Sequence, residues 1–288
     1  MAETEKESQL RENSKLEALL GKVLSPRIEK LSLLLSQSSD AIRDLAELTI
    51  GEALKKRVDP KAKLRRLAST QKKALELLEK VNVVYAQGVK DIIGKSYEVS
   101  VEQASKILNF KPPKNLFQSK TVTELIRSTI REFASLTDST MNRFALFITR
   151  TKQHILSDFE IAGNLAKGLG TRGTPQALSS ELRALFSRFS NGKLIQAGEK
   201  TYQLKTYAEM VSRTMTRDAN SIATVNTTLR SGNDLVQVSD HNTTTPICEK
   251  HEGKIYSISG ESVKYPKLKR RPAFHTNCFH VLFPYVEL

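Results

Sequence analysis

Cysteine and histidine, the residue types that bind zinc most readily, gather near the end of this chain. Four of the five His and both Cys lie in residues 231–288 of the 288-residue sequence. Four of these residues form two pairs with a two-residue gap, Cys248 with His251 and His275 with Cys278. Zinc favours four N and S ligands in a tetrahedron, and such a gap lets a tight turn direct two side chains at one ion. The spacing therefore predicts a zinc site formed by both pairs.

Four protein ligands leave no open position on the ion, so the predicted site is structural and not catalytic. A zinc staple also suits the segment around it, residues 235–288, which has few large apolar side chains. His241 and His280 are two further candidate ligands in this segment. Two other interpretations stay open: ordinary core and hydrogen-bonding roles for these residues, or a disulfide between Cys248 and Cys278.

The same histidines allow a metal-dependent nuclease of the HNH type, in which a His activates water and a metal polarises phosphate. That fold needs a helix after its hairpin, whereas the residues after His280, including Pro284, are typical of a strand. A DNA-binding zinc protein is another alternative, although recognition modules are usually basic themselves. Residues 231–288 hold 7 Lys+Arg against 6 Asp+Glu. Since no catalytic acid/base pair can be assigned, we expect no enzyme.

The formal charge of +14 belongs almost entirely to the preceding part of the chain. Residues 1–230 carry +13 of it, which indicates contact with a polyanion such as DNA or with an acidic protein. The densest basic block predicts a binding patch on one helix, with a solvated helix face as the other interpretation. This basic patch consists of Lys55, Lys56, Arg57, Lys61, Lys63, Arg65 and Arg66.

Periodic apolar residues predict helices over most of the first 230 residues. Pro26 and Asp59-Pro60 are expected to break them, and Ser100 is expected to cap a short new helix. A hairpin is predicted at 195–204 and strands at 235–238, 254–258 and 279–286. The expected class is α+β, with a mostly helical first two-thirds and a small β-rich module at the C-terminal end.

Three regions are predicted along the chain: a basic helical region (1–111), a helical connector (115–173) and an α+β domain (174–288) that contains the Cys/His module at 235–288. The longest apolar runs are far shorter than the roughly 20 residues of a membrane-spanning helix. The first residues lack the basic and apolar segments of a signal peptide. We therefore expect synthesis in a reducing cytoplasm.

An ordered set of motifs over about residues 175–288 includes the two Cys/His pairs and five further residues, Tyr207, Glu209, Arg213, Thr214 and Asp240. This set resembles the minor capsid protein 2 family of tailed phages, within the wider Mu F-like head-morphogenesis group. The chain departs from the family pattern at Thr276, where Pro is common, and at Phe279, where Arg is usual.

This resemblance implies a minor structural protein of the virion, made in the host cytoplasm and placed inside the head near the portal vertex. It implies portal or capsid protein as a partner and a role in head assembly, DNA packaging or DNA ejection. Packaged DNA would be contacted without sequence preference. The motif residues on the predicted helix 207–229 would define the fold, and we expect Arg213 to form a surface ion pair.

Overall fold

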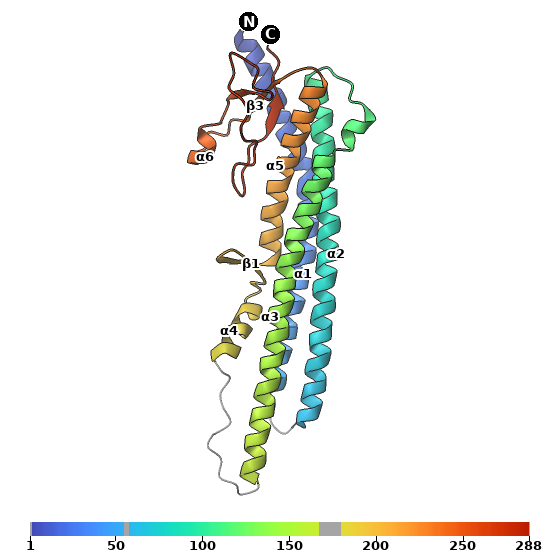
Figure 1. Cartoon of the computed structure of the whole chain (residues 1–288), viewed down its shortest axis with the longest axis vertical. Coiled ribbons are helices and arrows are strands. Elements are labelled where there is room, and N and C mark those ends of the chain that lie inside the picture. The colour runs from blue at the N-terminus through green and yellow to red at the C-terminus, as the bar shows by residue number, and fades with distance from the viewer. Residues whose placement is uncertain (1, 55–57, 167–179, 288) are drawn as a thin grey trace. The chain divides into compact units, whose positions relative to one another are not determined.

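The computed structural model describes residues 2–54, 58–166 and 180–287, and most of them are helical (Figure 1). The predicted α+β class is confirmed, because long helices fill the first two-thirds of the chain and a small strand-containing region follows. In chain order the elements are α1 (Ala2–Leu54), α2 (Pro60–Ile107), η1 (Lys114–Phe117), α3 (Lys120–Ala166), α4 (Ser180–Ser190), β1 (Ile195–Ala197), β2 (Lys200–Tyr202), α5 (Leu204–Arg230), β3 (Leu235–Val238), α6 (Pro246–Glu249), β4 (Ile255–Ser257) and β5 (Leu282–Pro284).

One of the two proline breaks predicted in the first 60 residues is confirmed. Helix α2 begins at Pro60, and the Asp59 carboxylate caps it by accepting a hydrogen bond from the Ala62 N–H at 3.1 Å. The break predicted at Pro26 is wrong, because α1 continues through this residue. Pro26 is exposed. Water can therefore satisfy the carbonyl that its missing N–H leaves free.

The predicted cap at Ser100 is also wrong, since this residue lies inside α2. Its hydroxyl is fully buried and accepts a hydrogen bond from the Asn220 amide at 3.1 Å. The side chain that the local pattern assigned to a helix cap therefore forms a hydrogen bond with another helix, α5, instead.

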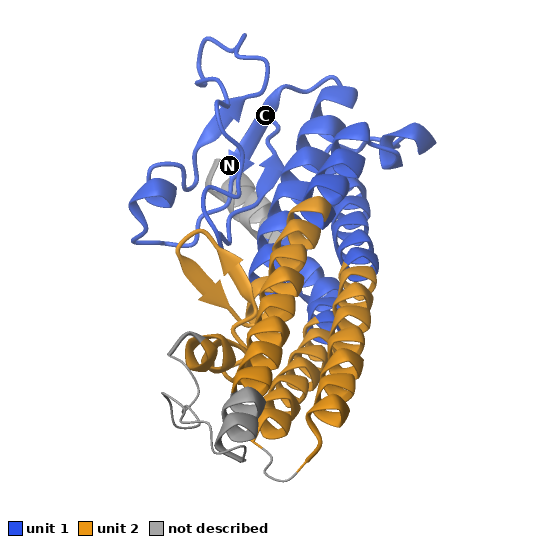
Figure 2. Cartoon of the chain, turned by 60° about the horizontal axis from the view of Figure 1, so that its bottom comes forward, with its two compact units in different colours: residues 1–31, 86–130, 208–288 blue, residues 32–85, 131–207 orange. Residues whose placement is uncertain are grey.

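Contacts divide the chain into two compact units, each assembled from separate stretches (Figure 2). Helices α1, α2, α3 and α5 each contribute to both units. The predicted three-region division stays a prediction, and its boundary at 173/174 lies outside the described residues. Unit 1 comprises residues 1–31, 86–130 and 208–288, and unit 2 comprises residues 32–85 and 131–207.

Aromatic side chains form much of the core of unit 2. Tyr85 of α2 stacks on Phe133 of α3, with ring centroids 3.6 Å apart. Phe144 of α3 meets Phe189 of α4 edge-on at 5.0 Å. Strands β1 and β2 pair antiparallel, so the hairpin predicted at 195–204 is confirmed.

Unit 1 contains a three-stranded antiparallel sheet in the order β4-β3-β5. The central Val236 pairs with Tyr256 on one side and with Pro284 on the other. The three predicted strands of this region are confirmed: the strand at 235–238 has the predicted bounds, and the other two are shorter than predicted. The core around the sheet includes both cysteines; its buried members are Val236, Val238, Cys248, Tyr256, Phe274, Cys278 and Leu282.

The first turns of α1 share a second core of unit 1 with the last strand. Leu16, Leu20 and Leu24 recur every fourth residue along one face of α1 and are buried against Val281 and Phe283. This face places α1 beside the Cys/His module.

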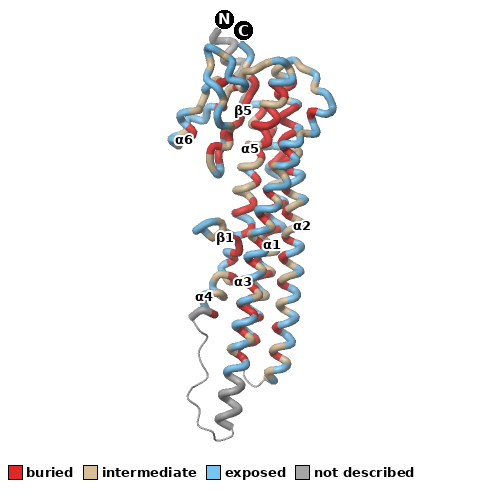
Figure 3. The backbone as a smooth tube through the Cα atoms, viewed as in Figure 1, coloured by how far each residue is buried: buried red, intermediate tan, exposed pale blue. Residues whose placement is uncertain are grey.

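Helix α5 meets the module through a face that is polar yet buried, and buried positions along it can be followed in Figure 3. The Asn220 side chain accepts a hydrogen bond from the Leu282 N–H at 3.0 Å. The Thr224 hydroxyl donates to the Leu282 carbonyl at 3.0 Å, and the Ser221 hydroxyl donates to the Pro272 carbonyl at 2.7 Å. Hydrogen bonds therefore fix where the end of the module lies along α5.

Candidate metal centre

The first Cys/His pair sits on a single tight helical turn. Helix α6 starts at Pro246, and the Cys248 N–H donates to the Thr245 carbonyl at 2.9 Å. The His251 N–H then donates to the Cys248 carbonyl at 2.7 Å, which closes the next turn. This local structure buries the Cys248 side chain against the sheet.

The second pair sits on a turn that α5 supports. The Cys278 N–H donates to the His275 carbonyl at 3.1 Å. Asn277 has a φ of 62°, a left-handed conformation that Asn tolerates better than most residues. Its N–H donates to the hydroxyl of Thr214, one of the motif residues, at 3.3 Å. The turn therefore forms with Thr276 in the place where the family commonly has Pro.

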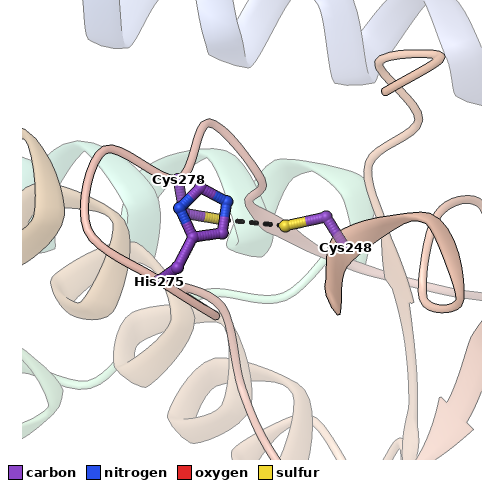
Figure 4. A group of neighbouring side chains, drawn as sticks. All are labelled: Cys248, His275 and Cys278. Atoms are coloured by element: carbon purple, nitrogen blue, oxygen red, sulfur yellow. Dashed lines mark hydrogen bonds between the residues drawn. The ribbon is translucent and has the colours of Figure 1, made fainter. Parts of the chain in front are cut away.

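Three of the four predicted ligands converge, as Figure 4 shows. Ligand atoms of Cys248, His275 and Cys278 all lie within 4.8 Å of one another. The two Sγ atoms are 3.9 Å apart. Two thiolates on one tetrahedral zinc stand about 3.8 Å apart, because each Zn–S bond is about 2.3 Å long. The donor set and this spacing fit a zinc ion. Because His275 is only half-buried, an ion can reach the site from solvent.

The fourth predicted ligand, His251, has other contacts. Its Nδ1 lies 2.7 Å from the Tyr256 hydroxyl, and its ring stacks on Phe274 with centroids 4.4 Å apart. Burial, followed by the nearby charges of Lys250 and Lys254, lowers the pKa of His251 and so favours the neutral ring. The structure therefore brings together three members of the predicted set and places His251 beside them in an aromatic contact.

A buried polar chain runs from the second pair through His280 to Glu252. The Cys278 Sγ lies 3.4 Å from Nδ1 of His280, whose Nε2 lies 2.7 Å from the Glu252 carboxylate. Burial alone would lower the pKa of His280, but its hydrogen bonds to Cys278 and Glu252 raise it. Burial alone would raise the pKa of Cys278, but hydrogen bonds from His280 and the backbone lower it. For Cys248, burial and then the neighbouring Cys278 both raise the pKa.

Glu252 is the functional candidate that the sequence pattern missed. Its carboxylate accepts hydrogen bonds from the N–H groups of His241 and Thr243, at 3.1 Å and 3.0 Å, as well as contacting His280. No local pattern marks it, because His280 lies 28 residues further along the chain.

The remaining candidates of the module, His241 and Asp240, have contacts with other residues. The His241 Nε2 lies 3.2 Å from the Glu17 carboxylate of α1 and 2.9 Å from the Ser239 hydroxyl. Its ring meets that of His280 edge-on at 4.9 Å. Asp240 is exposed and accepts a hydrogen bond from the Asn242 N–H at 3.1 Å.

The motif residues at the start of α5 have structural contacts. The Tyr207 hydroxyl donates to the Glu132 carboxylate at 3.2 Å, and burial followed by the charge of Glu132 raises the pKa of Tyr207. Arg213 is exposed and lies 4.0 Å from the Glu209 carboxylate one turn earlier. At that distance and exposure the ion pair adds little stability.

The basic patch is partly used within unit 2. Lys63 is buried, and its ammonium group donates to the Ala53 carbonyl at the end of α1 at 3.4 Å. Arg66 donates to the Glu52 carboxylate at 3.1 Å. Lys61 and Arg65 are exposed on α2. The other three members, Lys55, Lys56 and Arg57, lie outside the described residues.

The arrangement around His280 differs from an HNH nuclease. The described residues that follow His280 contain β5 and no helix, so the helix that completes the nuclease hairpin is not among them. Nor is there, among the helices the structure describes, a stretch long and apolar enough to cross a membrane.

The fold and the site define a helix-rich α+β protein that ends in a small module with a Cys/His/Cys metal-site geometry. A family model for phage minor capsid protein 2 matches residues 60–287, and the chain belongs to that family. The family consists of bacteriophage capsid components, so the role is a structural one in the virion. Neither a curated protein nor a solved structure with significant similarity was found.

Proposed function

We propose that this protein is a minor structural component inside the head of a tailed phage, near the portal vertex. There it acts in head assembly, in DNA packaging or in DNA ejection. The observation that carries the proposal is the family match over residues 60–287. The host cytoplasm is the place of synthesis and assembly, and portal or capsid protein is the partner.

Contact with packaged DNA is the second part of the proposal. The +13 of residues 1–230 suits a polymer of phosphates. Lys61 and Arg65 are exposed and extend along α2 from its first turns, whereas Lys63 and Arg66 already have partners in the chain. Such contact is electrostatic and independent of sequence, so it weakens steeply as salt rises.

In this structural role, a zinc ion would stabilise the fold of the Cys/His module. Cys248, His275 and Cys278 would hold the ion, which when bound cross-links α6 to the turn at 275–278. The thiols sit in the same core as the sheet, so the cross-link would stiffen the whole module.

Co-purification with the portal tests the assembly role. The full chain is produced together with the portal protein of its phage, and the complex is isolated by size-exclusion chromatography. We expect this protein to elute with the portal oligomer and with proheads that contain a portal. The proposal would be contradicted if the protein eluted only in its free form, both in the presence of proheads and in the presence of isolated portals.

A further inference from the structure

Three convergent ligands leave one position of a tetrahedral zinc ion to be filled. Structural zinc sites take four protein ligands, so a fourth N or S atom is required close to Cys248, His275 and Cys278. Two histidines of the module are the candidates: His251, three residues after Cys248, and His280, whose Nδ1 lies 3.4 Å from the Cys278 Sγ. The spacing of the pairs favours His251, and the geometry favours His280.

His280 is buried and lies next to Cys278, one member of the convergent set. Cys278 and His280 are buried while Phe279 between them is 60% exposed, as expected where an extended chain turns alternate side chains to the same side. The Cys278 Sγ and the His280 Nδ1 are 3.4 Å apart. A thiolate and an imidazole on one tetrahedral zinc stand about 3.6 Å apart, given bonds of about 2.3 Å and 2.05 Å.

The Nε2 side of the His280 ring contacts a carboxylate, as is common for zinc-bound histidines. Its Nε2 meets the Glu252 carboxylate at 2.7 Å, so this nitrogen carries the proton and donates it. A ring that binds a metal with its proton on Nε2 uses the lone pair of Nδ1, the nitrogen that faces Cys278. The N–H groups of His241 and Thr243 fix the carboxylate in turn. A carboxylate behind a ligating His orients the ring and raises its basicity.

His251 is engaged elsewhere through both its nitrogen and its ring face. Nδ1 meets the Tyr256 hydroxyl at 2.7 Å, and the ring lies nearly parallel to Phe274, at 15°. To bind the ion it would have to give up a buried hydrogen bond and an aromatic contact. Binding through Nδ1 would leave the contact between the His280 Nε2 and the Glu252 carboxylate in place.

We propose that His280, through Nδ1, is the fourth zinc ligand, and that Glu252 is the positioning residue that orients it. This inference rests on the zinc staple of the proposed function. The ligand set is then Cys248, His275, Cys278 and His280, and His251 supports Tyr256 and Phe274 in the core of the module.

Zinc competition with a chromophoric chelator separates the two histidines, using the full chain and matched substitutions. His280→Gln is expected to weaken zinc binding by more than about 100-fold, since even loss of an orienting group costs about 10- to 100-fold. Glu252→Gln should fall within that 10- to 100-fold range while the Co²⁺ spectrum stays that of a tetrahedral site. His251→Gln should leave zinc affinity essentially unchanged. The reverse order for the two histidine variants would overturn the assignment.

Cadmium NMR on the unaltered protein gives the same answer where a variant fails to fold. In protein loaded with ¹¹³Cd, we expect scalar coupling from the metal to the rings of His275 and His280. Coupling to His251 in place of His280 would overturn the inference and leave the staple intact. Failure of the unaltered protein to bind zinc or cadmium would remove the staple and this inference together, whereas the assembly role is decided separately by the portal experiment.

Discussion

Single polar residues, together with the apolar core, hold the turns of the module in place. Asp234, just before β3, accepts hydrogen bonds from the Ser257 hydroxyl and, at 2.7 Å, from the Ser259 N–H. Burial alone would raise the pKa of Asp234, but these hydrogen bonds lower it. The ionised carboxylate therefore ties the chain after β4 to the start of the central strand.

Asp234→Asn should destabilise the module in a pH-dependent way. A lowered folded-state pKa means that ionised Asp234 stabilises the fold above its unfolded pKa of about 3.9. This contribution is lost as the pH falls through the folded-state value. Because hydrogen bonds to a charged group are worth about 1.5 to 3 kcal/mol, we expect a loss of about 1 to 2 kcal/mol at pH 7.

Urea denaturation of both proteins between pH 3 and pH 7 measures this difference. The gap should be constant from pH 5 upward and shrink below pH 4. Exposed Glu261 of the same module provides the control, since Glu261→Gln should change little. A gap that stays the same at pH 3 would contradict the role of the charge.

The sequence predicted Cys248, His275 and Cys278 as a group because two-residue gaps on turns leave few directions for the side chains. It could not separate His251 from His280, because ring direction depends on residues distant along the chain. The His251 ring stacks on Phe274, and the His280 ring forms a hydrogen bond with the Glu252 carboxylate.

Among the elements, α5 carries the module by hydrogen bonds. Asn220 is fully buried and joins two elements at once: it donates to Ser100 of α2 and accepts from the Leu282 N–H of β5. A buried amide of this kind specifies one position of the strand along the helix, which an apolar face could not do as sharply.

Asn220→Ala should lower the unfolding free energy by about 2 to 4 kcal/mol. The change leaves two buried groups, the Ser100 hydroxyl and the Leu282 N–H, without this partner, and a buried polar group left unpaired costs about 1 to 3 kcal/mol. Circular dichroism during urea denaturation provides the measurement. Asn226→Ala is the matched control on the same helix, because half-buried Asn226 donates to two side-chain hydroxyls, those of Tyr97 and Ser119. Its cost should be about 1 kcal/mol. Equal costs for both variants would show that Asn220 has no special role.

Periodicity predicted the helices of both units and the strands of unit 1, because each element buries one face. It misjudged Pro26 and Ser100, where a proline on an exposed face and a serine in a tertiary contact override local preference. The two-unit division could not be predicted, because each long helix changes neighbours partway along its length without a signal in the sequence.

At the scale of the whole chain, bound zinc should stabilise the Cys/His module and leave the stability of the core of unit 2 unchanged. Removal of the ion with a chelator is expected to increase amide exchange in β3, β4 and β5, while the core of unit 2 around Phe133 and Phe144 keeps its protection. With free zinc at 100 times its Kd, binding contributes about 2.7 kcal/mol, so exchange from the unfolded module should rise about 100-fold.

Hydrogen exchange followed by mass spectrometry resolves the two parts. Addition of excess zinc should restore the protection of the strands, which separates loss of the ion from damage by the chelator. Identical exchange with and without chelator, in protein shown to contain zinc, would count against a structural ion.

The core shared by Leu16, Leu20 and Leu24 with Val281 and Phe283 has a consequence for synthesis. The ribosome makes about 5 to 20 residues per second, so tens of seconds separate Leu24 from Val281. During that time the leucine face of α1 has no strand to cover it. Unit 2 has all its residues by Tyr207 and can fold during that wait. Completion of this core is therefore coupled to the synthesis of residues 281–283, and a chain interrupted before them would expose the leucines to quality control.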